Sequence, residues 1–483
     1  MNEKNTSGAP ARRFGLAGLT AIVFGTMVGG GIFNVAQNMA IGASAPAVLA
    51  AWLATAAGIL TLVVTFKILS DERPDLNAGI YEYAREGFGD YVGFNIAWGY
   101  WLCVGMGNVA YAVMLNDALG AFFPSLLDHS WPTIIFGFGF IWTMYALVVS
   151  GMRTASGVNI AMTVVKFSAI ALIVALLIAR FSIDEFVLEF TSPSVTGDFG
   201  AQVKNAMVIA LWCFIGVEGA VMMSARAKRP RDVGRAGLIG FGCAWVLYAL
   251  VSLLSYGVMS QAELAGLPNP SLAYVLKATC GPVACYFVIV SVIVSLVGSW
   301  IAWTLVCAQT PYEAAVVKIF PRRFLRVNHR GVPTRGLFVS SVFVSLFLVM
   351  VCSAEQVYIA ALDLTSVMVL PAYFFSGLYL WMSTGRRGSI GASMSRGRRI
   401  GARAVGVVCT LYCLWMLYAG NLSLLLLTTV FYLAGTPFYI SARREYAPPG
   451  KALFGPRDRA VLAALSVCAV TAVALYALDV VRL

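Results

Sequence analysis

The stretch FGTMVGGGIFN, residues 24–34, interrupts the first long apolar run of the chain with three consecutive glycines. Each glycine costs roughly 1 kcal/mol of helix stability relative to alanine, so Gly29, Gly30 and Gly31 predict a break in a membrane-spanning helix. A break at that depth frees backbone N–H and C=O groups, and irregular backbone inside a membrane is tolerated where it lines a cavity or is buried in protein. Taken alone, the glycines favour close helix packing, and a second break elsewhere in the chain would favour a binding site instead.

The rest of the chain has the composition of a polytopic membrane protein. Hydrophobic residues make up 60% of the 483 residues, charged residues 12%, and the mean hydropathy is +0.81. Apolar runs of about 20 residues recur from end to end and predict an all-α protein with roughly 12–13 transmembrane helices. The expected spans are 15–42, 44–66, 91–119, 131–150, 157–179, 205–225, 237–258, 283–312, 336–352, 356–382, 404–419, 421–441 and 460–480.

The basic residues predict the orientation of these spans. Most of the 34 lysines and arginines fall in alternate connections, which would all lie on one side of the membrane. The positive-inside rule then predicts a cytoplasmic N-terminus. The net charge of +12 indicates contact with the anionic surface of the lipid bilayer, not nucleic-acid binding. Residues 1–13 are polar and lack an apolar stretch before a cleavage site, so we expect no removable signal peptide.

A second interruption lies in the sixth expected span, VIALWCFIGVEGAVMMSARAKRP, which carries Gly216 and the acid Glu218 at its middle. Two breaks five spans apart are expected of two five-helix repeats of inverted topology, with the first helix of each repeat broken. The freed N–H groups, aided by the helix dipole, suit a carboxylate, and the freed carbonyls suit an ammonium group. An α-amino acid carries both. The alternative is that the glycines only permit close helix packing.

Three stretches carry a family resemblance: MVGGGIF, LWCFIGVEGA followed by RAKRPRDVGRA, and SWIAWTLVCAQTPYEAA with FPRRFLRVNHRGVPTRG. They resemble the basic amino acid/polyamine antiporters of the amino acid–polyamine–organocation superfamily, over nearly the whole chain. Within that family the chain is most similar to bacterial arginine/agmatine and arginine/ornithine antiporters. The resemblance implies a bacterial inner-membrane protein with a ten-helix inverted-repeat core that exchanges its substrates by alternating access. It implies no cofactor and no metal. Relatives are often homodimers, and the sequence leaves the oligomeric state open.

The resemblance and the span pattern together predict five segments. Residues 1–14 form a cytoplasmic tail, and 15–382 form the ten-helix transport core. Residues 383–403 form a cytoplasmic Gly/Ser/Arg linker, and 404–441 form the eleventh and twelfth helices. Residues 442–483 form a cytoplasmic loop and an extra helix, which occurs in the arginine/ornithine type.

The resemblance assigns the head-group site to the two breaks. Gly29–Gly31 match the turn that binds the substrate carboxylate. Relatives often carry a serine at the middle glycine, so its absence here leaves the carboxylate to backbone N–H groups. The carbonyls of Met27, Trp212 and Ile215 match those that receive the substrate α-ammonium.

The resemblance assigns the side-chain end of the substrate to other helices. Trp303 matches a tryptophan on which a guanidinium stacks, a contact worth roughly 2 kcal/mol when desolvated. Asn108 offers an amide oxygen to the guanidinium N–H groups. The backbone at Cys103 and Val104 matches a carbonyl contact to the same end, and Trp212 matches an aromatic lid over the substrate. Any single tryptophan could instead be a core filler or an interfacial anchor.

Two ionisable residues lie deep within expected spans and are hypothesised to be functional, because such groups are costly in a membrane. Glu218 could change protonation with substrate or offset its charge, and Tyr100 matches a tyrosine that hydrogen-bonds this acid and gates the inner side. Lys166 matches a lysine that occupies the sodium site of sodium-coupled relatives. The alternatives are a structurally satisfied glutamate and a snorkelling lysine, although Lys166 lies far inside its span.

The leading hypothesis is exchange of external arginine for internal agmatine. Arginine/ornithine exchange is a close alternative, and a proton-coupled symporter of basic amino acids is a less favoured one. A membrane enzyme is not expected. The two histidines, His129 and His329, fall in loops on opposite sides of the membrane, and no metalloprotease, nucleophile-elbow or phosphate-loop motif is present.

Overall fold

The computed structural model describes residues 14–126, 131–191, 197–353, 355–385, 390–420, 422–448 and 452–478. Within these ranges the chain is helical, with only two isolated β-bridges, Phe14 to Ala227 and Val327 to Pro333. The helices are α1 Leu16–Met27, α2 Val35–Ala40, α3 Ala45–Glu72, α4 Ile80–Phe88, α5 Asp90–Gly120, α6 Trp131–Val149, α7 Met152–Arg180, α8 Ile183–Thr191, α9 Phe199–Cys213, α10 Gly219–Met222, α11 Pro230–Ser255, α12 Gln261–Ala265, α13 Ser271–Cys280, α14 Pro282–Val316, α15 Thr334–Ser353, α16 Glu355–Gly385, α17 Ile390–Ser393, α18 Arg396–Ala419, α19 Leu422–Ala434, α20 Thr436–Tyr446 and α21 Pro456–Ala477.

The lengths and hydropathy of these helices confirm an all-α polytopic membrane protein. In the described part of the chain, 10 helices are long and apolar enough to cross a membrane. They correspond to expected spans, and the last of them is the extra helix, α21. The remaining expected spans fall on shorter pieces: α1 with α2, α9 with α10, and α15.

The first and sixth expected spans are broken, as the glycines predict. Helix α1 ends at Met27, a 3-10 turn covers Gly30–Phe33, and α2 begins at Val35. Helix α9 ends at Cys213, and α10 begins at Gly219 after a turn. The two breaks touch, because the Thr26 hydroxyl donates a hydrogen bond to the Gly216 carbonyl at 2.9 Å.

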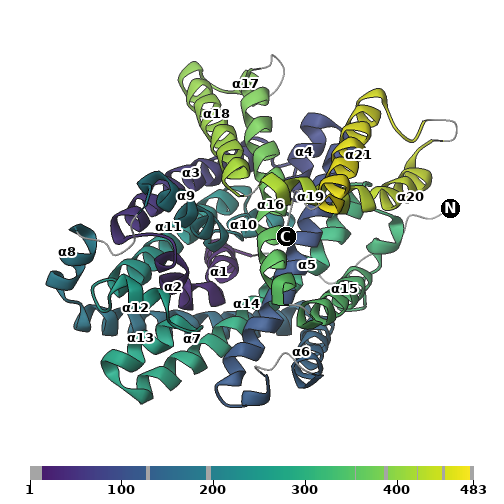
Figure 1. Cartoon of the computed structure of the whole chain (residues 1–483). Helices are drawn as coiled ribbons and strands as arrows, with labels where there is room; N and C mark the ends of the chain where they lie inside the picture. Colours follow the sequence, from purple (N-terminus) through teal and green to yellow (C-terminus); the bar gives the residue numbers. More distant parts are fainter. Residues whose placement is uncertain are drawn as a thin grey trace.

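Longer helices enclose the two breaks. Helices α1 and α10 lie near the centre of the view, with α3 and α11 on one side and α5 and α16 on the other (Figure 1). Helix α1 packs against α7, α11 and α14, and α14 in turn packs against α5 and α7. The breaks are therefore buried in protein, as irregular backbone in a membrane requires.

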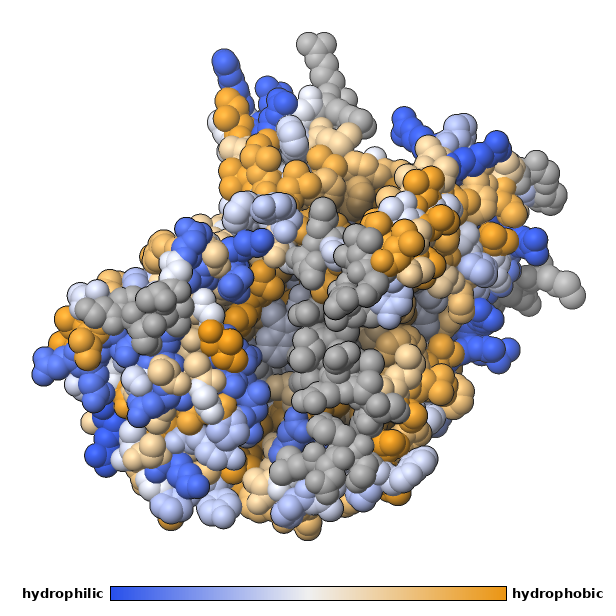
Figure 2. Space-filling view, in the orientation of Figure 1, coloured by the Kyte–Doolittle hydropathy of each residue, from blue (hydrophilic) through white to orange (hydrophobic). Residues whose placement is uncertain are grey.

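The C-terminal helices lie on the outside of this assembly. Figure 2 shows a largely apolar surface over α16 and α18, with hydrophilic side chains at the tip of α18. Helix α18 begins at Arg396, earlier than the span expected from residue 404, and its first turns carry exposed arginines. The helix thus continues past its apolar part, because long basic side chains are stable at the end of a span. Helix α21 packs mainly against α19.

Gly216 should be indispensable to the second break. Its φ of +107° is a conformation that side chains rarely adopt, and a Cβ there would lie 2.8 Å from Thr26 Cβ and 2.9 Å from the Thr26 carbonyl carbon. We expect Gly216→Ala to lower the stability by about 1–3 kcal/mol, measured as the melting temperature in detergent. Gly242→Ala in α11, where no neighbour lies within 4 Å, is the matched control. Equal melting temperatures for the two variants would contradict a constrained turn at Gly216.

Candidate functional site

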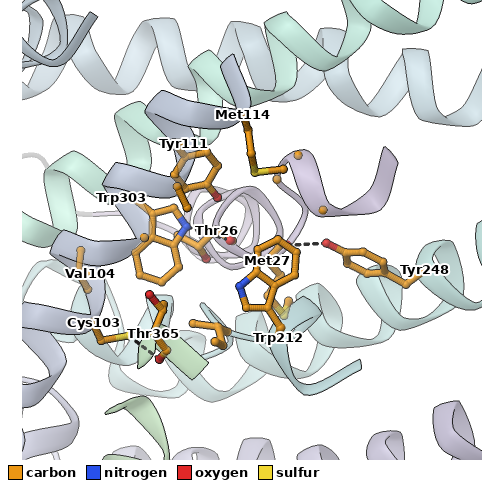
Figure 3. Close-up of a pocket in the computed structure, with 16 residues that line it drawn as sticks. Thr26, Met27, Cys103, Val104, Tyr111, Met114, Trp212, Tyr248, Trp303 and Thr365 are labelled. Atoms are coloured by element: carbon orange, nitrogen blue, oxygen red, sulfur yellow. Dashed lines mark hydrogen bonds between the residues drawn. The ribbon is translucent and has the colours of Figure 1, made fainter. Parts of the chain in front are cut away.

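A cavity lies against the first break and is lined by residues of α1, α5, α9, α11, α14 and α16. Figure 3 shows aromatic side chains from several of these helices directed into it. The lining residues that the sequence predicts are Met27, Gly29, Gly30, Gly31, Cys103, Val104, Trp212, Ile215 and Trp303. The lining residues that it does not predict are Thr26, Gly107, Ala110, Tyr111, Met114, Tyr248 and Thr365.

Each glycine of the first break is in contact with a side chain from another helix. A Cβ at Gly29 would lie 2.6 Å from the Tyr111 hydroxyl oxygen. A Cβ at Gly30 would overlap Leu296, and one at Gly31 would overlap the Trp212 ring. The bare backbone therefore permits close packing, and the three glycines also line the cavity.

The carbonyls at the end of α1 are held by side chains from the surrounding helices. The Tyr248 hydroxyl of α11 donates to the Met27 carbonyl at 3.0 Å. The Trp303 indole N–H of α14 donates to the Thr26 carbonyl at 3.1 Å. These bonds compensate for the i+4 amides that the break removes, and the bond to Thr26 fixes the orientation of the Trp303 ring. The Met27 carbonyl also accepts from the Gly29 amide at 3.1 Å, so both of its lone pairs are occupied and a ligand would replace one of these two donors.

Lys166 of α7 holds the same helix end from the other side. The side chain is 1% exposed, and its Nζ donates to the Val28 carbonyl, to the Ser299 hydroxyl at 3.0 Å and to the Gly25 carbonyl at 3.4 Å. One ammonium group thus joins the first, fifth and eighth expected spans. This is the place that the resemblance implies for a substitute of the sodium ion.

Glu218 lies within the second break and outside the residues that line the cavity. Its carboxylate is fully buried and accepts hydrogen bonds from the Tyr100 hydroxyl at 2.8 Å, the Tyr373 hydroxyl at 2.6 Å and the Gly216 amide at 3.1 Å. The tyrosines come from α5 and α16, so the acid joins three separate helices. The sequence predicts the bond to Tyr100, but it carries no local signal for Tyr373.

The far end of the cavity is formed by α5, α14 and α16. The Cys103 thiol donates to the Thr365 carbonyl at 3.3 Å, and both residues lie near the Trp303 ring in Figure 3. Val104 lines the cavity beside them. The indole of Trp303 and the side chains of Cys103, Val104 and Thr365 therefore line this end of the cavity together.

Asn108 is placed differently from the expectation. Its side-chain amide donates to the Val104 carbonyl at 3.0 Å, one turn earlier in α5. Asn108 lines a separate small cavity with Trp300 and Thr304 instead of the main one. An asparagine within a helix can bond to the carbonyl four residues earlier, and this bond uses the NH2 group of Asn108 and leaves its amide oxygen without a hydrogen-bond partner.

The sequence misses several lining residues for an identifiable reason. Tyr111 and Met114 share one face of α5 with Val104 and Gly107, at helical spacing, so periodicity alone could have found them. Tyr248 of α11 and Thr365 of α16 lie on helices far away in the sequence. No local pattern connects those two residues with the glycine turn.

Known proteins are similar to the whole chain. A model of the amino acid permease family matches residues 14–442. The arginine/agmatine antiporter of Chlamydia caviae is 38% identical over 99% of this chain and 99% of its own length. The arginine/agmatine antiporter of Chlamydia pneumoniae is 37% identical over 96% of this chain and 97% of its own length. A protein of Escherichia coli K12 named as an arginine/ornithine antiporter is 38% identical over 90% of this chain and 93% of its own length.

The contacts of Lys166 lead to a sharp prediction. Lys166→Ala removes the ammonium that holds the Val28 carbonyl and the Ser299 hydroxyl, so the broken helix end loses its support within the membrane. We expect substrate transport into proteoliposomes to fall to background while the protein still inserts and elutes as one species. Lys277→Ala, at an exposed position of α13, is the control. Near-normal transport by the Lys166 variant would remove this role.

Proposed function

The chain belongs to the amino acid permease family, and on that premise we propose that it is an antiporter that exchanges external arginine for internal agmatine by alternating access. It acts as a transporter and not as an enzyme. One observation carries the proposal. A single cavity combines the open backbone of a broken helix with the indole face of Trp303. The names of the Chlamydia relatives support the same substrates.

The head group of arginine binds at the two breaks. Its carboxylate accepts hydrogen bonds from the N–H groups of Gly29–Gly31, where the helix dipole also favours negative charge. Its α-ammonium donates to the carbonyls of Met27, Trp212 and Ile215. The close approach of Trp212 to Gly31 supports a lid role, because the ring already covers this end of the cavity.

The guanidinium of arginine stacks on Trp303. The guanidinium is planar and weakly hydrated, so an indole face is a favourable partner once water is excluded. The backbone of Cys103 and Val104 supplies carbonyl contacts. Asn108 lines the neighbouring cavity, and we propose that its amide oxygen, which has no partner there, accepts from the guanidinium when the substrate binds.

The acid in the second break provides the negative charge that a cationic substrate requires. Glu218 lies two residues after Gly216, and its hydrogen bonds with Tyr100 and Tyr373 join α5 and α16 to this break. Breaking these bonds would open the inner side, so Glu218 and Tyr100 form the gate. Lys166 takes the place of a sodium ion beside α1.

Exchange of arginine for ornithine is the second candidate, because the Escherichia coli relative carries that name. The indole face of Trp303 favours agmatine. Agmatine keeps the guanidinium that stacks on Trp303, whereas ornithine presents a compact and strongly hydrated ammonium. A proton-coupled symporter remains the third candidate, since Glu218 could carry a proton.

The protein lies in a bacterial membrane as a multi-pass protein. The proposal places the N-terminus and the arginine-rich connections on the cytoplasmic side of the inner membrane. The distribution of lysine and arginine supports this orientation. A reporter fused to either end would test it.

The direct test of the proposed function is counterflow in proteoliposomes. Vesicles preloaded with agmatine should take up labelled external arginine, whereas empty vesicles should not, because obligate exchange requires a counter-substrate. Vesicles loaded with ornithine, lysine or putrescine identify the preferred partner. Rapid uptake with ornithine and none with agmatine would select the second candidate. Uptake driven by a pH gradient into empty vesicles would select the symporter.

Trp303 should account for much of the affinity for the guanidinium. We expect Trp303→Leu to raise the arginine concentration needed for half-maximal exchange by about 10- to 30-fold, because about 2 kcal/mol of cation–π energy is lost. Trp131→Leu is the control, since Trp131 is 74% exposed in α6. An equal effect of both substitutions would argue against stacking on Trp303.

A further inference from the structure

The cavity contains a phenol that the proposed function does not use. Tyr111 projects from α5 into the cavity, with its ring beside Trp303 and its hydroxyl toward the broken helix (Figure 3). This hydroxyl oxygen is the atom nearest to the position that a Cβ would take at Gly29, at 2.6 Å. Tyr111 therefore presents a hydrogen-bond donor at the first glycine of the turn.

The middle glycine of the turn cannot supply a hydroxyl in its present surroundings. A Cβ at Gly30 would overlap Leu296 and lie 2.8 Å from the terminal methyl of Met114. Leu296 is fully buried, so a serine at position 30 would require repacking of the core. Apolar groups thus close the turn at its centre, and any side-chain donor must come from another direction.

The other side-chain donors that line the cavity mostly face backbone carbonyls. Thr26 donates to Gly216, Tyr248 to Met27, and Trp303 to Thr26, while Cys103 donates to Thr365 at the far end. Trp212 touches Gly31 through the edge of its six-membered ring, which is opposite its N–H. The Tyr111 hydroxyl lies against Gly29, beside Trp303 and Ser299, whereas the Tyr248 hydroxyl, which is also close to Gly29, donates to the Met27 carbonyl.

We infer that the Tyr111 hydroxyl donates a hydrogen bond to the carboxylate of the bound amino acid. The inference rests on the proposed function and deepens it. A phenol that donates to a carboxylate forms a charge-assisted bond, which is about twice as strong as a neutral one. The bond would join the substrate to α5, whereas the amides of Gly29–Gly31 join it to the broken helix.

This bond makes Tyr111 a specificity-determining residue between the two exchanged solutes. Arginine and ornithine carry the carboxylate, and agmatine does not. Agmatine keeps the guanidinium and the amine, so it lacks only the contacts to the carboxylate, which are those of Tyr111 and of the Gly29–Gly31 amides. The Tyr111 hydroxyl therefore strengthens arginine binding without any direct effect on agmatine.

The test is the ratio of two dissociation constants. Arginine and agmatine are titrated by calorimetry into the purified full chain and into Tyr111→Phe, which removes only the hydroxyl. We expect arginine binding to weaken by about tenfold or more, and agmatine binding to remain unchanged. Tyr256→Phe removes a phenol hydroxyl that bonds to the Ala43 carbonyl, outside the residues that line the cavity, so it should leave the ratio between the two ligands unchanged.

The outcomes separate the inference from the function on which it rests. If wild type binds both ligands and Tyr111→Phe weakens both equally, or neither, the hydroxyl has a structural role and the inference is overturned. If wild type binds neither ligand, the proposed function fails and the inference fails with it. If Tyr111→Phe does not purify as one species, Tyr111→Met removes the same hydroxyl and is scored by the same ratio.

Discussion

The structure depends on one constraint, that backbone polar groups inside a membrane must have partners within the protein. Two spans stop in mid-course, and each leaves carbonyls and amides without their helical partners. Side chains from the surrounding helices replace those partners: Tyr248 and Trp303 bond to the last turn of α1, and Lys166 bonds to the carbonyls beside it. The same bonds hold the side chains that line the cavity, so the contacts that stabilise the break also position the residues of the site.

The partners of the breaks come from different helices. Lys166 lies in α7, Trp303 in α14 and Tyr248 in α11, while Glu218 in the second break bonds to α5 and α16. Each broken segment is therefore held by a few polar contacts as well as by packing. A polar contact can be exchanged for one with a ligand, and an apolar contact cannot. This difference explains why the polar groups concentrate where the helices are interrupted.

The local features of this fold could be read from the sequence, but most of the pairing could not. Glycines inside an apolar run predict both breaks, and isolated charges within spans identify Glu218 and Lys166. Both signals are visible in the local sequence, because a glycine lowers helix stability and a charged residue is unfavourable inside a membrane. Tyr373 and Tyr248 acquire their roles from helices that meet them only in three dimensions. Asn108 lines a neighbouring cavity, and its contact with the ligand stays a prediction. The inverted repeat and the roles of individual site residues stay predictions.

Helix α21 changes what the C-terminal side of the molecule offers to its surroundings. It packs against α19 and turns Val467, Val470, Val473 and Tyr476 outward. The three valines recur every third position and, together with the ring of Tyr476, present an apolar surface that lipid tails can contact. On this side of the molecule, the outward face of α21 covers part of α19. The added helix thus replaces part of the outer surface of α19 with its own apolar face, which is well solvated by the acyl chains of the lipid.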